Sequence, residues 1–204
     1  MPNWCNNRLV VYGSKEVVEQ FLTDGINDSD EWTIGTYFPM PEELEGTDSP
    51  SKETNKELIE KYGADNWYDW QIRNYGCKWD CEAYDTPSTD DINYGVDSGT
   101  LDIRFDSPWS PPDTWMKKIS EKYPDLQFTL YFSEPGMGFG GAIYSSDGAY
   151  SIEEGDLEWM DCDGCTYQYD NDKECYIDDE TGEEISDEEA EEREIELRNP
   201  FEWG

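Results

Sequence analysis

The acidic residues of this chain outnumber its basic residues so strongly that they limit how it can fold. The sequence holds 50 Asp and Glu against 14 Lys and Arg, a formal net charge of -36. Leu, Ile, Val and Phe together number only 33 of 204 residues, a low apolar content that is typical of disordered chains. Nine Trp and fourteen Tyr offset this deficit, because each large aromatic side chain buries ~150–250 Å². We therefore expect an aromatic core whose indole and phenol groups are hydrogen-bonded.

The residue types and patterns that are missing exclude several classes of enzyme. The chain contains no histidine, so Ser-His-Asp triads, Cys-His pairs and His-ligated zinc sites are excluded. Neither GxGxxG nor GxxxxGK[ST] occurs, so no nucleotide-binding loop is predicted. No apolar run is long enough to span a membrane, and the first residues lack the pattern of a signal peptide. We expect a cytoplasmic protein whose six cysteines are thiols or metal ligands.

The charge density changes near residue 150, which predicts two parts. Residues 1–150 carry 28 acids and 11 bases, whereas residues 151–204 carry 22 acids and 3 bases. We predict a folded domain over 1–150, with an inserted segment at about 39–75 where prolines interrupt the periodicity. An acidic C-terminal extension over 151–204 follows. Within it, the residues around Tyr167 indicate a hairpin, and the capping box of Ser186 and Glu189 predicts a helix over 187–197.

The hydrophobic periodicity of the first part predicts alternating strands and helices. Strands are expected at 6–13, 31–38, 100–107 and 125–134, with a hairpin at 140–154. Helices are expected at 14–25, capped by Ser14, at 56–63, and from a cap at Ser110 to Pro124. Two strand–helix–strand units that pack both helices on one sheet face give a ferredoxin-like α+β sandwich.

Five separate segments also make this sequence similar to a known family. They are MPNWCNN, PMPEEL, NYGCKWD, FDSPWSPPDTW and YFSEPGMGFGG. In this order they make residues 1–145 resemble the YubB-like proteins of phages, plasmids and genomic islands. The resemblance implies a ferredoxin-like fold and a bacterial host, and no established biochemical role comes with it. Cys77 replaces the threonine-like residue that is usual in that family, and the acidic extension lies outside the shared pattern.

The segment NYGCKWDC, residues 74–81, combines two cysteines with a lysine and a tryptophan. Its alternation predicts a half-buried strand in which Trp79 fills the core, while Lys78 and Asp80 face outward or pair with charges. A zinc clip formed by Cys77 and Cys81 is the alternative. Along a regular strand these cysteines lie ~13 Å apart, which is too far to share one metal ion.

A second group of cysteines gives the better candidate for a metal site. Cys162 and Cys165 form a C-x2-C pair around a turn glycine, and Cys175 follows them, so zinc bound by these three thiolates is one hypothesis. The chain has no histidine to act as a fourth ligand. Free cysteines that flank a hairpin are the simpler interpretation. A redox role is disfavoured, because the surrounding aspartates raise the thiol pKa.

Carboxylates are too abundant to indicate a catalytic pair, so we assign no catalytic residue. Glu134 is interpreted as a surface acid that flanks a hairpin. The glycines of residues 136–141 are interpreted as permitting a turn and close packing of strands rather than cradling a ligand.

The density of carboxylates is the strongest indication of function. Duplex DNA carries one negative charge per ~1.7 Å, so a surface dense in carboxylates resembles it electrostatically. The hypothesis is a non-enzymatic phage or mobile-element protein that binds a basic, nucleic-acid-binding host protein. It would act as a DNA mimic or anti-defence inhibitor of the anti-CRISPR or anti-restriction type. The candidate partner-binding residues are Asp178, Asp179, Glu180, Glu183, Glu184, Asp187, Glu188, Glu189, Glu191, Glu192 and Glu194.

Other interpretations of the same sequence remain open. The extension is also typical of a solvated acidic tail that confers solubility. A cysteine-metal-binding accessory protein, or an enzyme of unknown substrate, is the alternative from another class. An inert virion component is a third. Direct binding to nucleic acid or to a membrane is not expected, because like charges repel.

Overall fold

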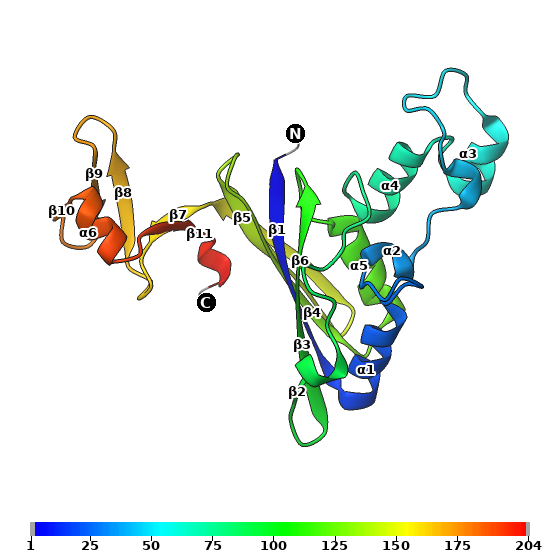
Figure 1. Ribbon diagram of the computed structural model, residues 1–204, viewed down its shortest axis with the longest axis horizontal. Coiled ribbons are helices and arrows are strands. Elements are labelled where there is room, and N and C mark those ends of the chain that lie inside the picture. The colour runs from blue at the N-terminus through cyan, green and yellow to red at the C-terminus, as the bar shows by residue number, and fades with distance from the viewer. Residues whose placement is uncertain (1–2, 203–204) are drawn as a thin grey trace.

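The computed structural model describes residues 3–202, and its largest element is a six-stranded antiparallel sheet (Figure 1). The strand order is β2-β3-β1-β4-β5-β6. The strands are β1 (Trp4–Ser14), β2 (Asn93–Tyr94), β3 (Ser98–Pro108), β4 (Gln127–Glu134), β5 (Phe139–Ser146) and β6 (Ala149–Asp156).

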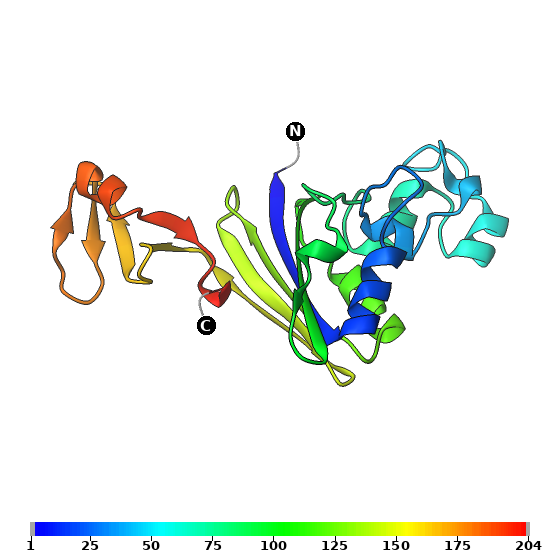
Figure 2. The same ribbon diagram turned by 60° about the horizontal axis from the view of Figure 1, so that its bottom comes forward.

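Two helices cover one face of this sheet and leave the other face open (Figure 2). They are α1 (Lys15–Asp24), which follows β1, and α5 (Asp113–Lys122), which joins β3 to β4. Strand β1 is antiparallel to both β3 and β4, and β2 is antiparallel to β3. The order β4-β1-β3-β2 with two crossover helices on one face is the ferredoxin-like arrangement. The predicted fold class is confirmed.

A hairpin extends the sheet beyond its ferredoxin-like strands. Strands β5 and β6 pair from Ser146 and Ala149 onward. Asp147 and Gly148 form the turn with φ of 52° and 78°, as a two-residue hairpin turn requires. The predicted hairpin is confirmed. Strand β6 crosses residue 150 and ends at Asp156.

The core between sheet and helices is built from aromatic rings, as the composition predicts. Trp32, Trp115 and Phe21 are fully buried. The indole N–H of Trp32 donates to Tyr37 Oη at 3.1 Å, and that hydroxyl donates to Phe21 O at 2.7 Å. The indole N–H of Trp115 donates to Ile34 O at 2.9 Å. The polar ends of these rings are therefore satisfied inside the core.

The strand predicted at 31–38 is wrong. Trp32 and Thr33 make only isolated bridges, and a short helix, α2 (Ile34–Tyr37), follows them. The Thr33 side chain accepts from Thr36 N and caps that helix. Packing decides the conformation here, because Trp32, Ile34 and Tyr37 all reach the core. The second ferredoxin-like strand is instead the two-residue β2.

The chain between α2 and β2 forms a helical insertion at one end of the sheet (Figure 1). Helix α3 (Lys56–Tyr62) is capped by the Asn55 side chain, and α4 (Trp67–Tyr75) by Asn66. Each ends at a glycine with positive φ, Gly63 at 78° and Gly76 at 85°, as helix C-termini favour. Two 3-10 turns complete it: η1 (Glu42–Leu44) and η2 (Thr89–Asp91).

The two predicted serine caps are wrong in detail. Ser14 occupies the N-cap position of α1, but its side chain makes no capping hydrogen bond. Helix α5 begins at Asp113 after Pro112, and the Ser110 hydroxyl instead donates to Gly76 O at 3.4 Å. The prolines delay the start of α5, because they favour extended backbone before a helix.

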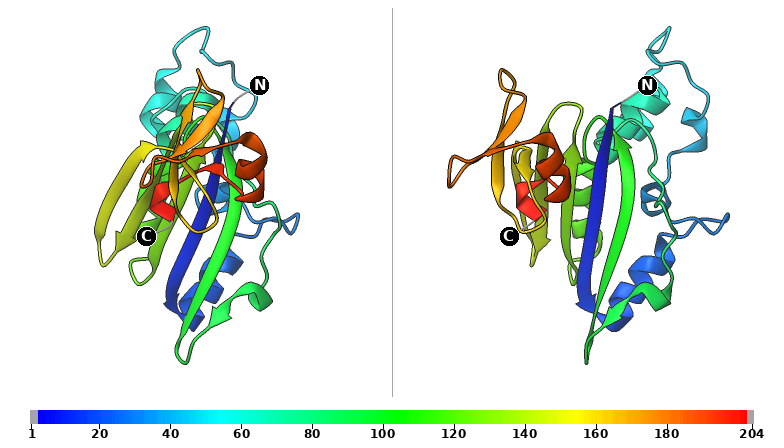
Figure 3. Two further views of the ribbon diagram at one scale, coloured as in Figure 1. Left: turned by 90° about the vertical axis from the view of Figure 1, so that its left-hand side faces the viewer. Right: turned by 60° about the vertical axis from the view of Figure 1, so that its left-hand side comes forward.

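The remaining residues fold into a second, smaller sheet beside the first (Figure 3). Its order is β10-β9-β8-β7-β11. Tyr167, Ile185, Ala190 and Ile195 form its own small core. Its elements are β7 (Glu158–Met160), β8 (Thr166–Asp170), β9 (Cys175–Asp178), β10 (Glu184–Ile185), α6 (Asp187–Glu192), β11 (Glu196–Arg198) and η3 (Pro200–Glu202).

Within residues 3–202, no helix combines the length and apolar character needed to cross a membrane.

Replacing Trp115 by alanine is expected to lower the free energy of unfolding by about 3–5 kcal/mol, because it leaves a large cavity. The loss also removes the hydrogen bond to Ile34 O. Urea denaturation followed by circular dichroism measures this change in the free energy of unfolding. Val96→Ala is the matched control: that side chain is 99% exposed, so its effect should stay within about 0.5 kcal/mol. Equal midpoints for the two variants would contradict this account of the core.

Candidate partner-binding surface

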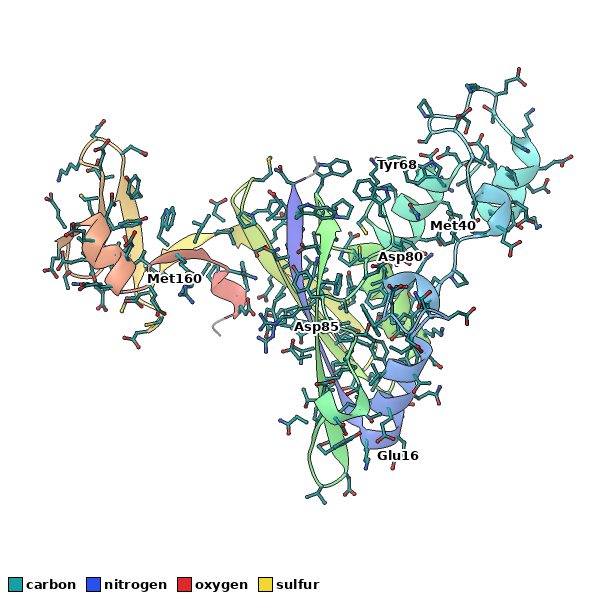
Figure 4. All side chains as sticks on the ribbon, viewed as in Figure 1. Glu16, Met40, Tyr68, Asp80, Asp85 and Met160 are labelled. Atoms are coloured by element: carbon teal, nitrogen blue, oxygen red, sulfur yellow. The ribbon has the colours of Figure 1, made fainter. Side chains whose placement is uncertain are left out.

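The predicted partner-binding acids lie together in the second sheet, on consecutive elements of residues 158–202, which we call the acidic module. Asp178 ends β9, and Asp179, Glu180 and Glu183 belong to the turn that follows. Glu184 lies in β10, and the next five acids lie in α6. All eleven are exposed except Asp178, which is half-buried. Side chains that end in oxygen atoms point outward around this module (Figure 4).

Helix α6 is held on the module by one apolar residue and one cap. The Ser186 hydroxyl accepts from Glu189 N at 3.3 Å, so the predicted cap is confirmed. Ala190 is buried in the small core. The helix ends at Glu192 rather than at residue 197, because Glu194 takes a positive φ of 55° and the chain enters β11. Its acids therefore face solvent around one buried alanine.

The basic residues of the module neutralise few of these acids. Lys173 forms an ion pair with Glu184, and Arg198 with Glu196 at 3.7 Å. A hydrogen bond with Tyr167 raises the pKa of Arg193. With 22 acids against 3 bases in residues 151–204, the module carries a large net negative charge.

Two aspartates of the module organise its turns. Asp161 Oδ1 accepts from the backbone N–H groups of Asp163 and Cys165, both at 2.9 Å, and Oδ2 accepts from the Tyr167 hydroxyl at 2.7 Å. Burial opposes the charge of Asp161, but these hydrogen bonds outweigh it and lower its pKa. The backbone N–H of Thr181 likewise lowers the pKa of Asp178. Both turns therefore rest on ionised carboxylates.

The structure does not bring the three candidate zinc ligands together. Cys162 and Cys165 lie in the turn before β8, whereas Cys175 pairs with Asp170 at the far end of that strand. Thr166 and Asp170 are four residues apart in an extended strand, which separates the two ends by ~13 Å. Residues 3–202 contain no group of three or more Cys, Asp or Glu that could hold a metal ion. The zinc site stays a prediction from spacing.

The segment NYGCKWDC ends α4 at Tyr75 and continues as a bent loop, so the predicted strand is wrong. The bend brings Cys77 Sγ and Cys81 Sγ to 3.7 Å, and Trp79 O accepts from both thiols. The cysteines are buried, whereas Trp79 is only half-buried. Asp80 lies beside α2 (Figure 4), where its Oδ1 accepts from Gly35 N at 2.7 Å. Alternation failed as a guide because Gly76, with φ of 85°, turns the chain.

The expectation that Glu134 is a surface acid is wrong. It is only 1% exposed, and its Oε2 has no hydrogen-bond partner among the described residues. The glycines that follow act as expected. Gly138 turns the chain with a φ of 75°. A Cβ on Gly141 would lie 2.2 Å from Glu153 O, so only glycine permits this approach of β5 and β6.

Contacts at both ends of the acidic module join it to the open face of the large sheet. Leu157 N donates to Gly138 O at 2.8 Å where the module begins. The Asn199 amide donates to Phe132 O and Gly141 O at 3.0 and 2.9 Å where it returns.

A cavity of about 280 Å³ lies at the same joint, and its lining includes Arg8, Arg104, Tyr131 and Glu202. Arg8 pairs there with Asp102 at 2.6 Å and with Glu202 at 3.2 Å. The Arg8 charge is thus matched by one carboxylate of β3 and one of η3.

Comparison with known proteins finds one family. Residues 75–179 match the model of a family described as the ferredoxin-like domain in Api92-like proteins. The crystal structure of a protein api92 from Yersinia pseudotuberculosis is similar over 76% of this chain and 98% of that chain, at 15% sequence identity and a TM-score of 0.42. No curated protein matches the sequence. The matched range contains β2 to β9, and so reaches from the large sheet into the acidic module.

Replacing Asp161 by asparagine is expected to destabilise the protein by about 1–3 kcal/mol at pH 7, because it removes a buried charged acceptor. The pKa of Asp161 is lowered by folding, so its contribution is present above the unfolded value of about 4 and is lost as pH falls through the folded value. Urea denaturation at several pH values should show the two proteins converging below about pH 4. The exposed Asp163→Asn is the control, and a gap that persists in acid would argue against this role.

The six cysteines are expected to react in two groups with a thiol reagent. Burial raises the pKa of Cys5 to about 12, and the hydrogen bond with Cys77 together with burial raises that of Cys81. Cys162 and Cys165 are exposed and Cys175 is half-buried. Three thiols should therefore react in the native protein and three more only in urea. Mass spectrometry of the labelled peptides identifies them, and uniform labelling of the native protein would contradict the buried group.

Proposed function

The chain belongs to the family of Api92-like proteins with a ferredoxin-like domain, and we propose that it acts by binding a basic, nucleic-acid-binding protein. The carboxylates of the acidic module occupy the surface on which that partner binds nucleic acid. The protein is then a non-enzymatic DNA mimic that inhibits its partner. The observation that carries this proposal is that seven of the eleven candidate acids lie on β9, β10 and α6, and the other four lie in the turns that adjoin these elements.

The spacing of charge on α6 supports mimicry of a nucleic acid. Five of its six residues are acids. At a rise of ~1.5 Å per residue, the helix carries one carboxylate per roughly 1.8 Å, close to the ~1.7 Å per charge of duplex DNA. Like charges at this density repel one another within the helix, and a cationic groove relieves that repulsion. Binding to a basic surface therefore stabilises α6.

The setting that we propose is a bacterial host whose defence is blocked by a mobile element. The five segments shared with YubB-like proteins support an origin in a phage, plasmid or genomic island, and a cytoplasmic location. A mobile element gains from inhibiting a nuclease or another DNA-binding protein of the host. Such targets share a basic groove, which is the feature that the acidic module complements.

Displacement of host proteins from immobilised duplex DNA tests this proposal. The full chain should release one or a few nucleic-acid-binding proteins at about 0.1 M salt, and this release should disappear toward about 0.5 M, because salt screens the charges. The test variant neutralises four exposed acids of α6: Asp187→Asn, Glu188→Gln, Glu191→Gln and Glu192→Gln. We expect it to need at least about tenfold more protein for the same release.

A second variant with the same net charge provides the control. It neutralises four exposed acids of the first part: Glu16→Gln, Glu53→Gln, Asp85→Asn and Asp97→Asn. Figure 4 shows Glu16 at the end of the large sheet far from the acidic module. This variant should release the same proteins as the full chain. Equal losses in both variants would show that net charge alone acts, and no release by the unmodified chain would refute mimicry.

A further inference from the structure

Three tryptophans from distant parts of the chain meet at the end of the large sheet where β1 begins. The ring of Trp79 lies 6.2 Å from that of Trp4 and 6.3 Å from that of Trp109, and the planes of Trp79 and Trp109 differ by only 27°. Trp4 and Trp109 are 45% and 46% exposed. We call these three residues the tryptophan cluster. Exposed aromatic groups of this kind mark interaction sites, and Trp is enriched among residues that dominate binding energy.

The backbone of Trp109 takes a strained conformation beside the start of β1. Its φ is 67°, a left-handed conformation that large side chains rarely adopt. Its N–H donates to Asn3 O at 3.0 Å, which ties it to the start of β1. Pro108 precedes it, and Pro111 and Pro112 follow closely. Such strain collects at functional sites, because the surrounding structure must over-determine it.

The cluster already holds a cation of its own chain. The Lys78 ammonium lies over the rings of both Trp79 and Trp109, with Nζ 4.4 and 5.2 Å from their centroids. The negative face of an indole ring attracts cations. Lys78 thus shows where a positive charge is stabilised on this surface.

Carboxylates close to the cluster also favour a positively charged ligand. Asp106 pairs with Asn6 of β1, two residues from Trp4. A Cβ on Gly136 would lie 2.9 Å from both Asn3 Nδ2 and Glu134 Oε1, so Glu134 lies beside the residue that precedes Trp4. Glu134 is 1% exposed and its Oε2 has no hydrogen-bond partner among residues 3–202. The Asp106 carboxylate near the start of β1 disfavours an anionic ligand such as a nucleotide on these rings.

We propose that the tryptophan cluster binds an arginine side chain of the basic partner, an inference that rests on the proposed function. Arginine fits better than lysine, because its planar guanidinium stacks on indole rings and is weakly hydrated. The incoming guanidinium takes the place of the Lys78 ammonium. The cluster then supplies contact energy that salt does not screen, while the acidic module supplies long-range attraction.

Short peptides distinguish this site from the acidic module. The probes are an octa-arginine and an octa-lysine peptide, and tryptophan fluorescence reports binding. At about 0.5 M salt, where exposed charges beyond ~5 Å are screened, the arginine peptide should bind more tightly than the lysine peptide. Trp109→Gly should weaken binding of the arginine peptide by roughly 5- to 30-fold and remove the preference. Glycine suits the positive φ of residue 109, so this variant keeps its fold.

Further variants separate the outcomes. Lys78→Met should tighten binding of the arginine peptide, because it removes the competing ammonium, whereas weaker binding would overturn the proposed exchange of cations. Trp4→Ala should weaken it, and Tyr12→Ala, which removes an exposed ring at the other end of β1, should not. The α6 variant should lose binding at low salt but keep the arginine preference at high salt. If only the α6 variant loses binding, the proposed function stands and this inference fails. If only the tryptophan variants lose binding, the acidic module is not the binding surface.

Discussion

Hydrogen bonds to the polar ends of buried aromatic rings hold this protein together. A chain with few branched aliphatic residues must bury Trp and Tyr instead, and each brings an N–H or O–H into the core that is costly if unpaired. Three of these polar groups are hydrogen-bonded inside the core. The Trp32 N–H donates to the Tyr37 hydroxyl, the Tyr37 hydroxyl donates to Phe21 O, and the Trp115 N–H donates to Ile34 O. The non-strand conformation of residues 32–37 follows from this need, because it delivers both Trp32 and Tyr37 to the same cluster.

This core leaves all of the described acids but Glu134 and Asp161 exposed or half-buried, and their distribution divides the molecule into regions of different charge. The acidic module displays its carboxylates around a very small apolar centre, and α6 contributes a single buried alanine to it. At the end of the large sheet where β1 begins, the indole rings of Trp79 and Trp109 flank the ammonium of Lys78. Both regions favour a cationic partner, one through long-range attraction and the other through direct contact with a ring.

The ferredoxin-like fold can be predicted from the sequence because its long elements have periodic apolar patterns. The candidate site can be predicted only in part. β1, β3, β4 and α1 each carry a clear apolar pattern, whereas β2 has two residues and no pattern. Ser186 predicted its helix because a cap is a local interaction. Glu134 and Trp79 were misplaced because their burial depends on segments far away in sequence.

The acidic module is anchored at both ends, which reduces the conformational entropy that it loses when a partner binds. The module leaves the large sheet at Leu157 and returns to it at Asn199, and each residue is hydrogen-bonded to β4, β5 or the turn between them. A tail attached at one end would give up much of its conformational entropy when a partner orders it. A segment fixed at both ends has lost that entropy on folding. More of its electrostatic attraction therefore appears as affinity, and less is spent on ordering the chain.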